Sequence, residues 1–392
     1  MSSPTTSRPL DGLVVLDLSR VLAGPYATQM LGDLGAEVWK VERPGLGDET
    51  RAWGPPFVGE FSAYFLSVNR NKRSAALDFR DPASIAALHA AAARADIVVE
   101  NFLPGDLVPF GLDAASLRRR HPELIVCSIT GFGQDGPYAM LPGYDAVLQG
   151  FVGLQSITGE PDRPPVKVGV AVVDVLTGVH AASAILAALV GRLRGAGGCH
   201  LDVPLFEVSV ASLVNVSQSA LVTGQPARRY GTGHPQIVPY QTFEAADGAL
   251  VVAIGNDEQW GRLCRAIGAD DLAGDARFAT NPGRVVHRAE VIGALGARFA
   301  GETRDAVLAK LAAASVPAGA VRGMDEVMRD PALAARDMVR RADLSGGAGS
   351  VPLLALPWKS DGRRPPLEWP PPALGQHTAE FLERFAFGPA FG

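Results

Sequence analysis

The sequence is poor in the residues that build metal sites and disulfide frameworks. Its 392 residues include three cysteines, Cys127, Cys199 and Cys264, which stand far apart without a C-x-x-C spacing. The seven histidines are scattered and form no H-E-x-x-H pair. These absences exclude a disulfide scaffold and argue against a zinc site. We therefore expect a protein of a reducing compartment that holds no metal.

Signals for nucleotide folds, membranes and nucleic acids are missing as well. Neither G-x-G-x-x-G nor G-x-x-x-x-G-K-[ST] occurs, so a dinucleotide or Walker-type site is not supported. No apolar run reaches the roughly 18 uninterrupted residues of a transmembrane helix, and residues 1–7 lack an apolar signal core. A formal net charge of -5 gives no reason to expect nucleic acid as a partner. We expect a cytoplasmic protein without a membrane or nucleic-acid partner.

What the sequence does contain is a series of short apolar runs. Hydrophobic residues make up 47% and charged residues 20%, which is typical of a globular protein, and the length suffices for two or more cores. Residues 13–18 and 37–42 resemble buried strands. Residues 26–34 between them have a helical pattern closed by Gly35. This β-α-β start predicts a doubly wound α/β domain with a parallel sheet.

The alternation of strands and helices continues to about residue 223, where the composition changes. We predict helices at 82–94, 114–120, 145–155, 176–194 and 207–221, and strands at 74–79, 96–102, 124–129 and 201–205. The predicted organisation is a large α/β domain at 1–223 that is completed by 343–392, a linker at 224–239, a small α+β domain at 240–325 and a return linker at 326–342. The small domain opens with a hairpin at 240–254 that turns at Asp247-Gly248.

Asp174 stands between a run of valines and the long apolar segment 175–193. A carboxylate in such company is costly to desolvate unless it is paired or used in chemistry. Aspartate before an apolar helix is also a favoured N-cap. The residues alone leave both interpretations open, a cap for the helix expected from residue 176 and a catalytic carboxylate.

Two loops and one cluster of cations lie at predicted strand ends. Residues 43–59 and 130–137 are rich in glycine and proline, and loops at strand ends are where α/β folds bind ligands. The cluster Arg70, Lys72 and Arg73 precedes the strand at 74–79. It is either a solvated surface or a phosphate site.

Several motifs in order along the chain resemble a known family. They are Pro9-Leu-Asp-Gly12, Ala23-Gly-Pro25, Leu31-Gly-Asp-Leu-Gly-Ala-Glu37, Asn69-Arg-Asn-Lys-Arg73, Glu100-Asn-Phe102, Gly143-Tyr-Asp145 and Gly375-Gln-His-Thr378. In these the sequence is similar to class III CoA-transferases, the superfamily of formyl-CoA transferase and α-methylacyl-CoA racemase. The segment from Gly47 to Gly59 further resembles the branch of succinyl-CoA:glutarate (hydroxymethylglutarate) CoA-transferases.

The resemblance implies a reaction and leaves one alternative. CoA would move from an acyl-CoA such as succinyl-CoA to a dicarboxylic acid such as glutarate, hydroxymethylglutarate or itaconate, through an aspartyl-CoA thioester. CoA thioesters would be substrates, and no tightly bound cofactor is expected. The alternative is an α-methylacyl-CoA racemase or epimerase. That branch uses a Gly-His-Asp tripeptide, whereas this sequence has Tyr144 in place of the histidine. Phenols ionise near pH ~10, so the departure favours transfer.

The resemblance also assigns site residues. Asp174 would be the nucleophile, kept ionised by the positive end of its helix. Residues implied at the CoA site are Val21, Leu22, Ala23, Arg43, Leu77, Asp78, Phe79, Arg80, Asn101, Phe102, Leu103, Tyr144 and Asp145. Residues expected at the substrate pocket are Arg20, Arg51, Trp53, Tyr64, His234 and Gln236. The two arginines suit bidentate capture of a carboxylate, the two aromatic residues match family aromatics near the active site, and the last two stand in for a glycine-rich loop of the family that this sequence lacks. Pro109 and Pro142 replace a family arginine and lysine.

The family resemblance completes the expected architecture. It implies a large Rossmann-like domain and a smaller α+β domain that long linkers join into an open ring. Two such rings would interlock as a homodimer.

Overall fold

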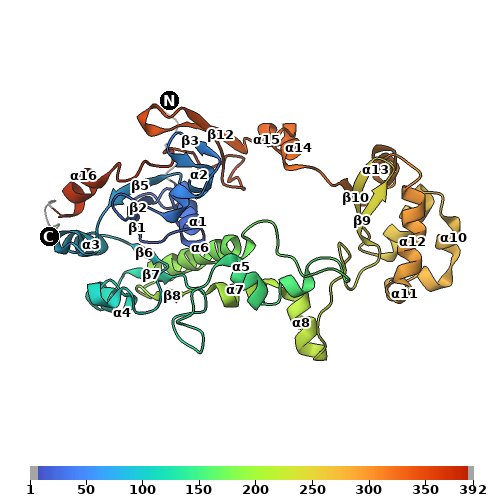
Figure 1. The fold of residues 1–392 in the computed structure, drawn as a ribbon, viewed down its shortest axis with the longest axis horizontal. Coiled ribbons are helices and arrows are strands. Elements are labelled where there is room, and N and C mark those ends of the chain that lie inside the picture. Colours follow the sequence, from blue (N-terminus) through green and yellow to red (C-terminus); the bar gives the residue numbers. More distant parts are fainter. Residues whose placement is uncertain (1–7, 387–392) are drawn as a thin grey trace. The chain divides into compact units, whose positions relative to one another are not determined.

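The computed structural model describes residues 8–386. The chain divides into two compact units (Figure 1). The first joins Met1–Val152, Val168–Gly224 and Pro331–Gly392, and the second joins Gly153–Lys167 and Gln225–Asp330. Each unit is therefore assembled from stretches that are separate in the sequence.

The first unit is built on a six-stranded sheet in the order β5-β2-β1-β6-β7-β8. Every neighbouring pair in this sheet is parallel. The strands are β1 Val14–Asp17, β2 Glu37–Glu42, β5 Lys72–Ala76, β6 Ile97–Glu100, β7 Ile125–Ser128 and β8 His200–Asp202. The predicted α/β fold with a parallel central sheet is confirmed.

Alternate residues of the strands enter two different cores. Val15 pairs in register with Val38 and Ile97, and all three are buried in the core that contains α1 (Ala23–Asp33) and α6 (Val172–Leu193). The next layer holds Leu16, Trp39 and Val98, which face the opposite core. Because strand side chains alternate between faces, each strand contributes to both cores. The sheet therefore needs a cover on both sides.

Helices and the C-terminal segment provide that cover. The opposite core includes residues of α3 (Pro82–Ala92) and α4 (Ala114–Arg120), together with Phe381 and Phe385. Both phenylalanine rings pack edge-on against Trp39, at centroid distances of 5.4 and 5.5 Å. They belong to α16 (Thr378–Phe381) and the π-helical segment Leu382–Ala386 that follows it.

The open edge of β5 is also covered by the C-terminal segment. His377 donates its backbone N–H to the Ser74 carbonyl at 2.8 Å and accepts the Ser74 N–H on Nδ1 at 3.2 Å. Thr378 Oγ1 accepts the Ala76 N–H at 2.9 Å. An uncovered edge strand invites pairing with other chains. These contacts give the motif Gly375-Gln-His-Thr378 a structural role.

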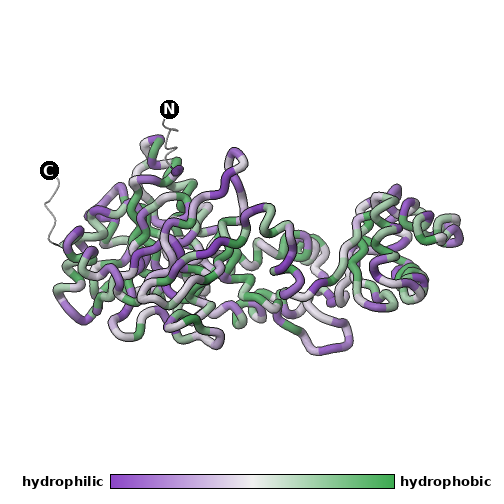
Figure 2. Tube along the Cα trace, turned by 90° about the horizontal axis from the view of Figure 1, so that it is seen from above, coloured by the Kyte–Doolittle hydropathy of each residue, from purple (hydrophilic) through white to green (hydrophobic). Residues whose placement is uncertain are grey.

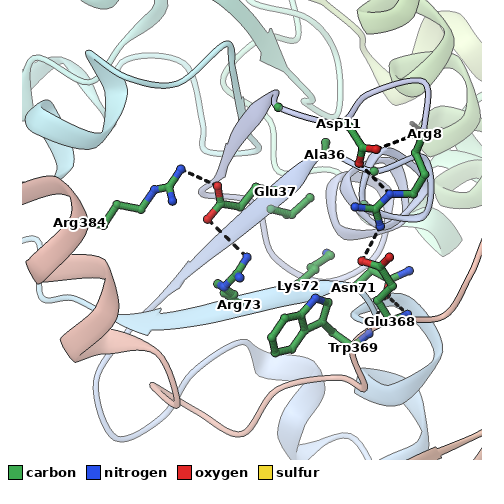
Figure 3. Close-up of a pocket in the computed structure, with 14 residues that line it drawn as sticks. Arg8, Asp11, Ala36, Glu37, Asn71, Lys72, Arg73, Glu368, Trp369 and Arg384 are labelled. Carbon is green, nitrogen blue, oxygen red and sulfur yellow. Dashed lines mark hydrogen bonds and ion pairs between the residues drawn. The ribbon is translucent and has the colours of Figure 1, made fainter. Parts of the chain in front are cut away.

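A cavity of about 390 Å³ lies at the amino ends of β2 and β5 (Figure 3). We call it the basal cavity, and it is lined by Arg8, Asp11, Glu37, Arg73, Glu368, Trp369 and Arg384 with their neighbours. Arg8 pairs with Asp11 and Glu368, while Glu37 pairs with Arg73 and Arg384. The Arg73 guanidinium also lies over the Trp369 ring, 4.9 Å from its centroid. Cations and carboxylates here neutralise one another.

Helix α6 is long and apolar enough to cross a membrane by length and composition. The helices α7 (Leu205–Ser212) and α8 (Val214–Thr223) pass the same test only when this pair, bent by 81°, is counted as one span. Ala181, Ile185 and Leu189 of α6 are buried in the core shared with α1. Packing within this unit accounts for that apolar face.

Three smaller helices and two short hairpins complete the first unit. The helices are α2 (Ala63–Val68), α5 (Asp145–Phe151) and α15 (Pro331–Ala335), and the hairpins are β3 (Phe57–Val58) with β4 (Phe61–Ser62) and β12 (Val339–Asp343) with β13 (Ser350–Leu354). The one helix predicted at 207–221 is wrong, because Val214 adopts φ +42° and breaks it into α7 and α8.

The second unit is a three-stranded antiparallel sheet with helices. The strands are β9 (Tyr240–Ala245), β10 (Gly248–Ala253) and β11 (Ala318–Ala320), in the order β11-β10-β9. The helices are α9 (Asp257–Ala266), α10 (Asp270–Gly274), α11 (Asn281–Val286), α12 (Arg288–Phe299), α13 (Arg304–Ala313) and α14 (Met324–Met328). Hydrophobic and hydrophilic residues alternate along this unit (Figure 2). Its separate core includes Phe243, Trp260 and Leu295.

Candidate active site

Asp174 lies in the first turn of α6, at the third helical residue. The helix begins at Val172, four residues before the predicted start, and its N-cap is Ala171, which makes no side-chain cap bond. The interpretation of Asp174 as the N-cap is therefore wrong. The exposed helix amides are instead capped by a residue that lies far away in the sequence.

That residue is Asp145, the first residue of α5. Its Oδ2 accepts the Val173 N–H at 2.7 Å and the Asp174 N–H at 3.3 Å. Gln149 donates its Nε2–H to Asp145 Oδ1 at 2.6 Å and so fixes the carboxylate. A carboxylate at a helix N-terminus satisfies free amides and interacts favourably with the helix dipole. Asp145 thus takes the position that would have kept Asp174 ionised.

The environment of Asp174 disfavours its charge. Burial, together with the nearby Asp145 carboxylate, raises the pKa of Asp174 to about 7. The direction is opposite to the one expected from a helix N-terminus. Burial and the same two carboxylates raise the pKa of Tyr64 to about 12. No residue between 8 and 386 forms an ion pair with Asp174. Such a perturbed carboxylate in a cavity is typical of a functional site.

A cavity of about 260 Å³ contains Asp174, and we call it the Asp174 cavity. It is lined by Arg20, Val21, Leu22, Ala23, Asn101, Phe102, Leu103, Asp106, Ile129, Thr130, Gly131, Pro142, Gly143, Tyr144, Asp174 and Leu205. Most of these residues follow the carboxyl ends of β1, β6 and β7. Ligands of open α/β sheets bind at this edge, where neighbouring loops leave a crevice.

A second cavity of about 600 Å³ lies along the ends of β1, β2 and β5, and we call it the outer cavity. It is lined by Leu18, Arg20, Lys40, Val41, Glu42, Arg43, Pro44, Leu46, Gly47, Asp48, Glu49, Leu77, Asp78, Phe79, Arg80 and Phe102. Arg20 and Phe102 line both cavities. The guanidinium of Arg20 lies 5.3 Å from the Phe102 ring centroid. The two cavities therefore share a wall.

The structure brings most of the predicted CoA-site residues together. Val21, Leu22, Ala23, Asn101, Phe102, Leu103 and Tyr144 line the Asp174 cavity, while Arg43 and the segment 77–80 line the outer cavity. Arg80 pairs with Asp78 at 2.8 Å. Arg43 is exposed and forms no ion pair with any residue of the described range. Its guanidinium is available to an anionic ligand.

The predicted substrate-pocket residues belong to both units. Arg51 is held by Glu42 through two contacts of 2.7 Å and does not occur among the described residues lining either cavity. Trp53 packs edge-on against Tyr64 at 5.1 Å. His234 and Gln236 belong to the second unit, where the His234 carbonyl accepts a bond from Arg288 at 2.9 Å. Arg20 is the predicted pocket residue that lines the Asp174 cavity.

Neither interpretation of the cation cluster holds. Arg70 pairs with Asp33, and Lys72, 1% exposed, lies 3.1 Å from Asp17 in the interior. Arg73 is paired with Glu37 and Glu380. All three cations pair with carboxylates on other elements. On a solvated surface they would face water instead, and in a phosphate site they would need to be free of such partners. The cluster is structural.

Sequence reasoning missed two groups of residues at the site. One comprises Lys40 and Asp48, a buried ion pair in the lining of the outer cavity with a Nζ–Oδ2 distance of 2.8 Å. The other is the close contact of Gly131 with Gly143, where an added Cβ on Gly131 would lie 2.9 Å from the Gly143 Cα. The helix-cap position of Asp48 before Glu49-Thr50 was a signal that could have found it. Residues 8–386 contain no group of three or more His, Cys, Asp or Glu placed to hold a metal.

A parallel sheet with a cavity at its carboxyl edge, and in that cavity an aspartate of raised pKa, is the arrangement of an α/β enzyme. Comparison with known proteins shows which family of enzymes this is. The model of CoA-transferase family III matches residues 10–378, and the chain belongs to this family. It is therefore a CoA-transferase.

Two family members and one solved structure show how similar the chain is to individual proteins of this family. The chain is 44% identical over 386 residues to a succinate–glutarate CoA-transferase of Agrobacterium fabrum, covering 97% of this chain and 96% of that protein. It is 42% identical to the human succinyl-CoA:glutarate CoA-transferase, covering 96% of this chain and 86% of that protein. A solved structure of a family protein from Brucella suis aligns with a TM-score of 0.84 at 44% identity, covering 97% of this chain and all of the other.

Proposed function

We propose that this enzyme transfers CoA from succinyl-CoA to glutarate, with Asp174 as the nucleophile. The observation that carries the proposal is a carboxylate without an ion-pair partner among the described residues, placed in a cavity at the carboxyl edge of the sheet. The two relatives named for succinate and glutarate support the choice of donor and acceptor. Hydroxymethylglutarate and itaconate are the other acceptors to compare.

The chemistry proceeds by exchange at three carbonyl groups, those of the donor acyl group, the Asp174 side chain and the acceptor. An Asp174 oxygen attacks the thioester carbonyl, the C–S bond breaks, and CoA leaves as thiolate from an aspartyl-succinyl anhydride. The thiolate then attacks the aspartyl carbonyl, which releases succinate and forms the aspartyl-CoA thioester. The acceptor carboxylate attacks this thioester, and the expelled thiolate attacks the acceptor acyl group. The product acyl-CoA leaves and the Asp174 carboxylate is regenerated. The relay divides one difficult exchange into easier steps and needs no net proton.

The cavities supply positions for the two ends of the acyl-CoA. In this proposal the outer cavity takes the nucleotide end, with Arg43 on a phosphate and the segment 77–80 beside the adenine. The shared wall at Arg20 and Phe102 carries the chain toward the Asp174 cavity. Val21, Leu22 and Ala23 contact the pantetheine, and Tyr144 lies beside the reacting carbonyl. CoA thioesters act as substrates, and no resident cofactor is required.

Arg20 is our candidate for binding the far carboxylate of the acid. Its guanidinium pairs with Glu49 at 2.8 Å and is 46% exposed, so it can exchange that partner for a ligand. Arg51, Trp53, Tyr64, His234 and Gln236 stay predictions for the same pocket. A tyrosine at position 144 rather than a histidine supports transfer over racemisation.

The proposal includes an interlocked homodimer of ring-shaped chains in the cytoplasm. Exposed apolar side chains of the first unit support a second copy as partner. They are Val179, Val190 and Leu193 of α6, Val210 of α7, and Val214, Leu221 and Val222 of α8. Light scattering would give a mass of two chains. Subunit exchange with a tagged copy would require unfolding if the rings interlock, and free exchange would contradict interlocking.

The deciding experiment measures acceptor use and traps the intermediate. Purified enzyme is incubated with succinyl-CoA and a panel of C4 to C6 dicarboxylates, and new CoA thioesters are quantified. We expect glutaryl-CoA to form with the highest kcat/KM. Borohydride or hydroxylamine added with succinyl-CoA alone should modify Asp174, as peptide mass spectrometry would show. Racemisation of a branched acyl-CoA without transfer would overturn the proposal.

A further inference from the structure

Val21, in the wall of the Asp174 cavity, has a strained backbone. Its φ is +70°, in the left-handed region, where a β-branched residue is a clear outlier. This strain would shift an equilibrium between the left-handed and an ordinary backbone conformation roughly five- to thirty-fold toward the ordinary one. Strain of this kind persists only where the surroundings enforce it, and it gathers at functional sites. Some groups around Val21 must therefore hold it in this conformation.

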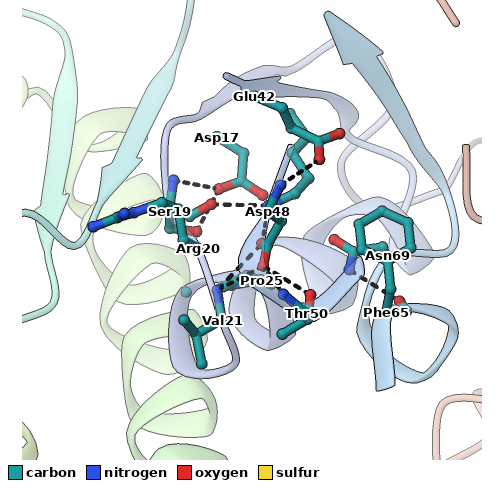
Figure 4. A network of polar contacts seen from close by, with 12 residues as sticks. Asp17, Ser19, Arg20, Val21, Pro25, Glu42, Asp48, Thr50, Phe65 and Asn69 are labelled. Carbon is teal, nitrogen blue, oxygen red and sulfur yellow. Dashed lines mark hydrogen bonds and ion pairs between the residues drawn. The ribbon is translucent and has the colours of Figure 1, made fainter. Parts of the chain in front are cut away.

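Three side chains hold the backbone of the segment that ends at Val21, and Figure 4 shows one of them, Asp48, beside Val21. Lys40 donates to the Ser19 carbonyl at 2.9 Å. The side-chain amide of Asn101 accepts the Arg20 N–H at 2.9 Å and donates to the Arg20 carbonyl at 2.8 Å. Asp48 accepts the Val21 N–H on its two oxygens at 3.3 and 3.2 Å. Consecutive backbone groups are thus fixed from three different elements.

Asp48 is itself rigidly placed. It is 1% exposed, pairs with Lys40 at 2.8 Å, and accepts the N–H and hydroxyl of Thr50 at 2.9 and 2.7 Å. Burial alone would raise the pKa of Asp48, but Lys40 and the Thr50 bonds outweigh it and lower the pKa to about 2. The carboxylate is ionised at neutral pH. It can therefore hold Val21 and Lys40 together.

The segment is coupled to the helix of Asp174 through tight packing. After Val21 the chain enters α1, and α1 crosses α6 at Gly178, one turn beyond Asp174. A Cβ on Gly178 would lie 2.7 Å from the Ala23 carbonyl oxygen. The Tyr26 side chain of α1 packs at the same point, with its Cβ at 3.2 Å from that position. The conformation of Val21 therefore sets the wall that faces Asp174.

We propose that Asp48, held by Lys40, is a positioning residue for acyl-CoA binding, because it keeps Val21 in its left-handed conformation. This inference rests on the proposed function only in taking acyl-CoA as the ligand of these cavities. Asp48 lies behind the wall of the Asp174 cavity and acts there through the backbone of Val21.

The test is a cycle of substitutions at both positions. In Asp48→Asn the amide NH₂ must face either Lys40 or the Thr50 N–H, donor against donor, and one oxygen at most is left to accept the Val21 N–H, so the hold on Val21 is weakened. We expect KM for succinyl-CoA and the calorimetric Kd for CoA to rise roughly tenfold or more, with kcat changed less than about threefold. In a Val21→Gly background the same substitution should cost less than about threefold, since glycine adopts a φ of +70° without strain.

Val21→Ala is the matched control, because alanine shortens the side chain but keeps the Cβ that causes the strain. Asp48→Asn should cost as much in the Val21→Ala background as in wild type. Equal losses in the Val21→Gly and Val21→Ala backgrounds would overturn the proposal, as would an unchanged KM and Kd in Asp48→Asn.

Two further variants separate positioning from general damage. Asp33→Asn removes another buried carboxylate, paired with Arg70 away from both cavities, and should lower Tm without changing KM. If Asp48→Asn does not fold, Thr50→Val removes one bond to Asp48 and should raise KM about threefold; an unchanged KM would count against the proposal. CoA binding is measured independently of turnover. A wild-type protein that binds CoA but transfers none to glutarate would defeat the proposed function alone.

Discussion

The basal cavity and the Asp174 cavity lie in the same unit and use charge in opposite ways. In the basal cavity Arg8, Arg73 and Arg384 all pair with carboxylates, and the guanidinium of Arg73 also lies over the Trp369 ring. In the other, the carboxylate of Asp174 has a second carboxylate, Asp145, as its neighbour. Matched charges lower the energy of the folded chain, whereas adjacent like charges raise it. The difference separates a region that maintains the fold from one that is kept reactive at some cost in stability.

The largest expected effect concerns activity. Asp174→Ala should lower the rate of CoA transfer by a factor of about 10³ or more, because the nucleophile is lost. Glu37→Gln in the basal cavity should keep the rate within about twofold. Initial rates of glutaryl-CoA formation compare the two. Activity retained in Asp174→Ala would remove Asp174 from the mechanism.

The next effect concerns stability, and the two cavities should respond with opposite signs. The folded pKa of Asp174, about 7, lies above its ordinary value of 3.8, so ionising it in the folded state costs stability. This cost is absent below about pH 3.8, grows between the two values and is complete above about pH 7. Asp174→Asn should therefore stabilise the protein by about 2 kcal/mol at pH 8 and by less at pH 5.

Glu37→Gln is the matched variant in the basal cavity, where we expect the free energy of unfolding to change in the opposite direction. It removes one of the two carboxylates paired with Arg73 and the carboxylate paired with Arg384, and should destabilise the protein by about 1 kcal/mol. Thermal unfolding at both pH values gives the comparison. A lower Tm for Asp174→Asn than for wild type at pH 8 would contradict this, because it would mean that the negative charge of Asp174 stabilises the fold despite burial and the neighbouring Asp145.

A smaller effect is expected from the residue that perturbs Asp174. Asp145→Asn removes the like charge while keeping an oxygen for the helix amides, so the pKa of Asp174 should fall. If it falls by about one unit, kcat/KM at pH 6 should rise roughly fivefold relative to its plateau, since more Asp174 is ionised. The pH dependence of kcat/KM, compared between wild type and Asp145→Asn, measures this shift. An acid limb that stays at the wild-type pH would show that burial alone sets it.

The smallest effect is expected at the rim of the basal cavity. Arg384 is 45% exposed, so Arg384→Ala should cost about 0.5 kcal/mol and less in high salt, with transfer unchanged. Unfolding in low and high salt checks this. A change in KM for succinyl-CoA would mean that the basal cavity also serves the reaction.

Much of the fold could be predicted where local pattern and tertiary context agree. The helix predicted at 114–120 and the strand at 37–42 match α4 and β2, because each has its own start signal or apolar pattern. The start of α6 was missed because the cap comes from Asp145, on another helix. Arg70 and Lys72 were misjudged because their partners, Asp33 and Asp17, lie on other elements. Ala318–Ala320 is too short to be told from a loop.

The candidate site divides in the same way. The loops at the strand ends could be predicted from topology, since parallel strands place their following residues at one edge. The strain at Val21 and the carboxylate that holds it could not, because φ depends on bonds from β2, the following turn and the end of β6. Sequence patterns record which residues a segment prefers, and Val21 is held against its preference.

The division of the first unit into three stretches has a consequence for the order of synthesis. A ribosome delivers residues 72–76 early, but the segment 375–378 that covers them emerges some 300 residues later, after all of the second unit. We expect the nascent chain to carry an open strand edge through most of translation and to depend on chaperones during that interval. Messages truncated before residue 375 should then yield aggregated product, although every residue that lines the Asp174 cavity has been made.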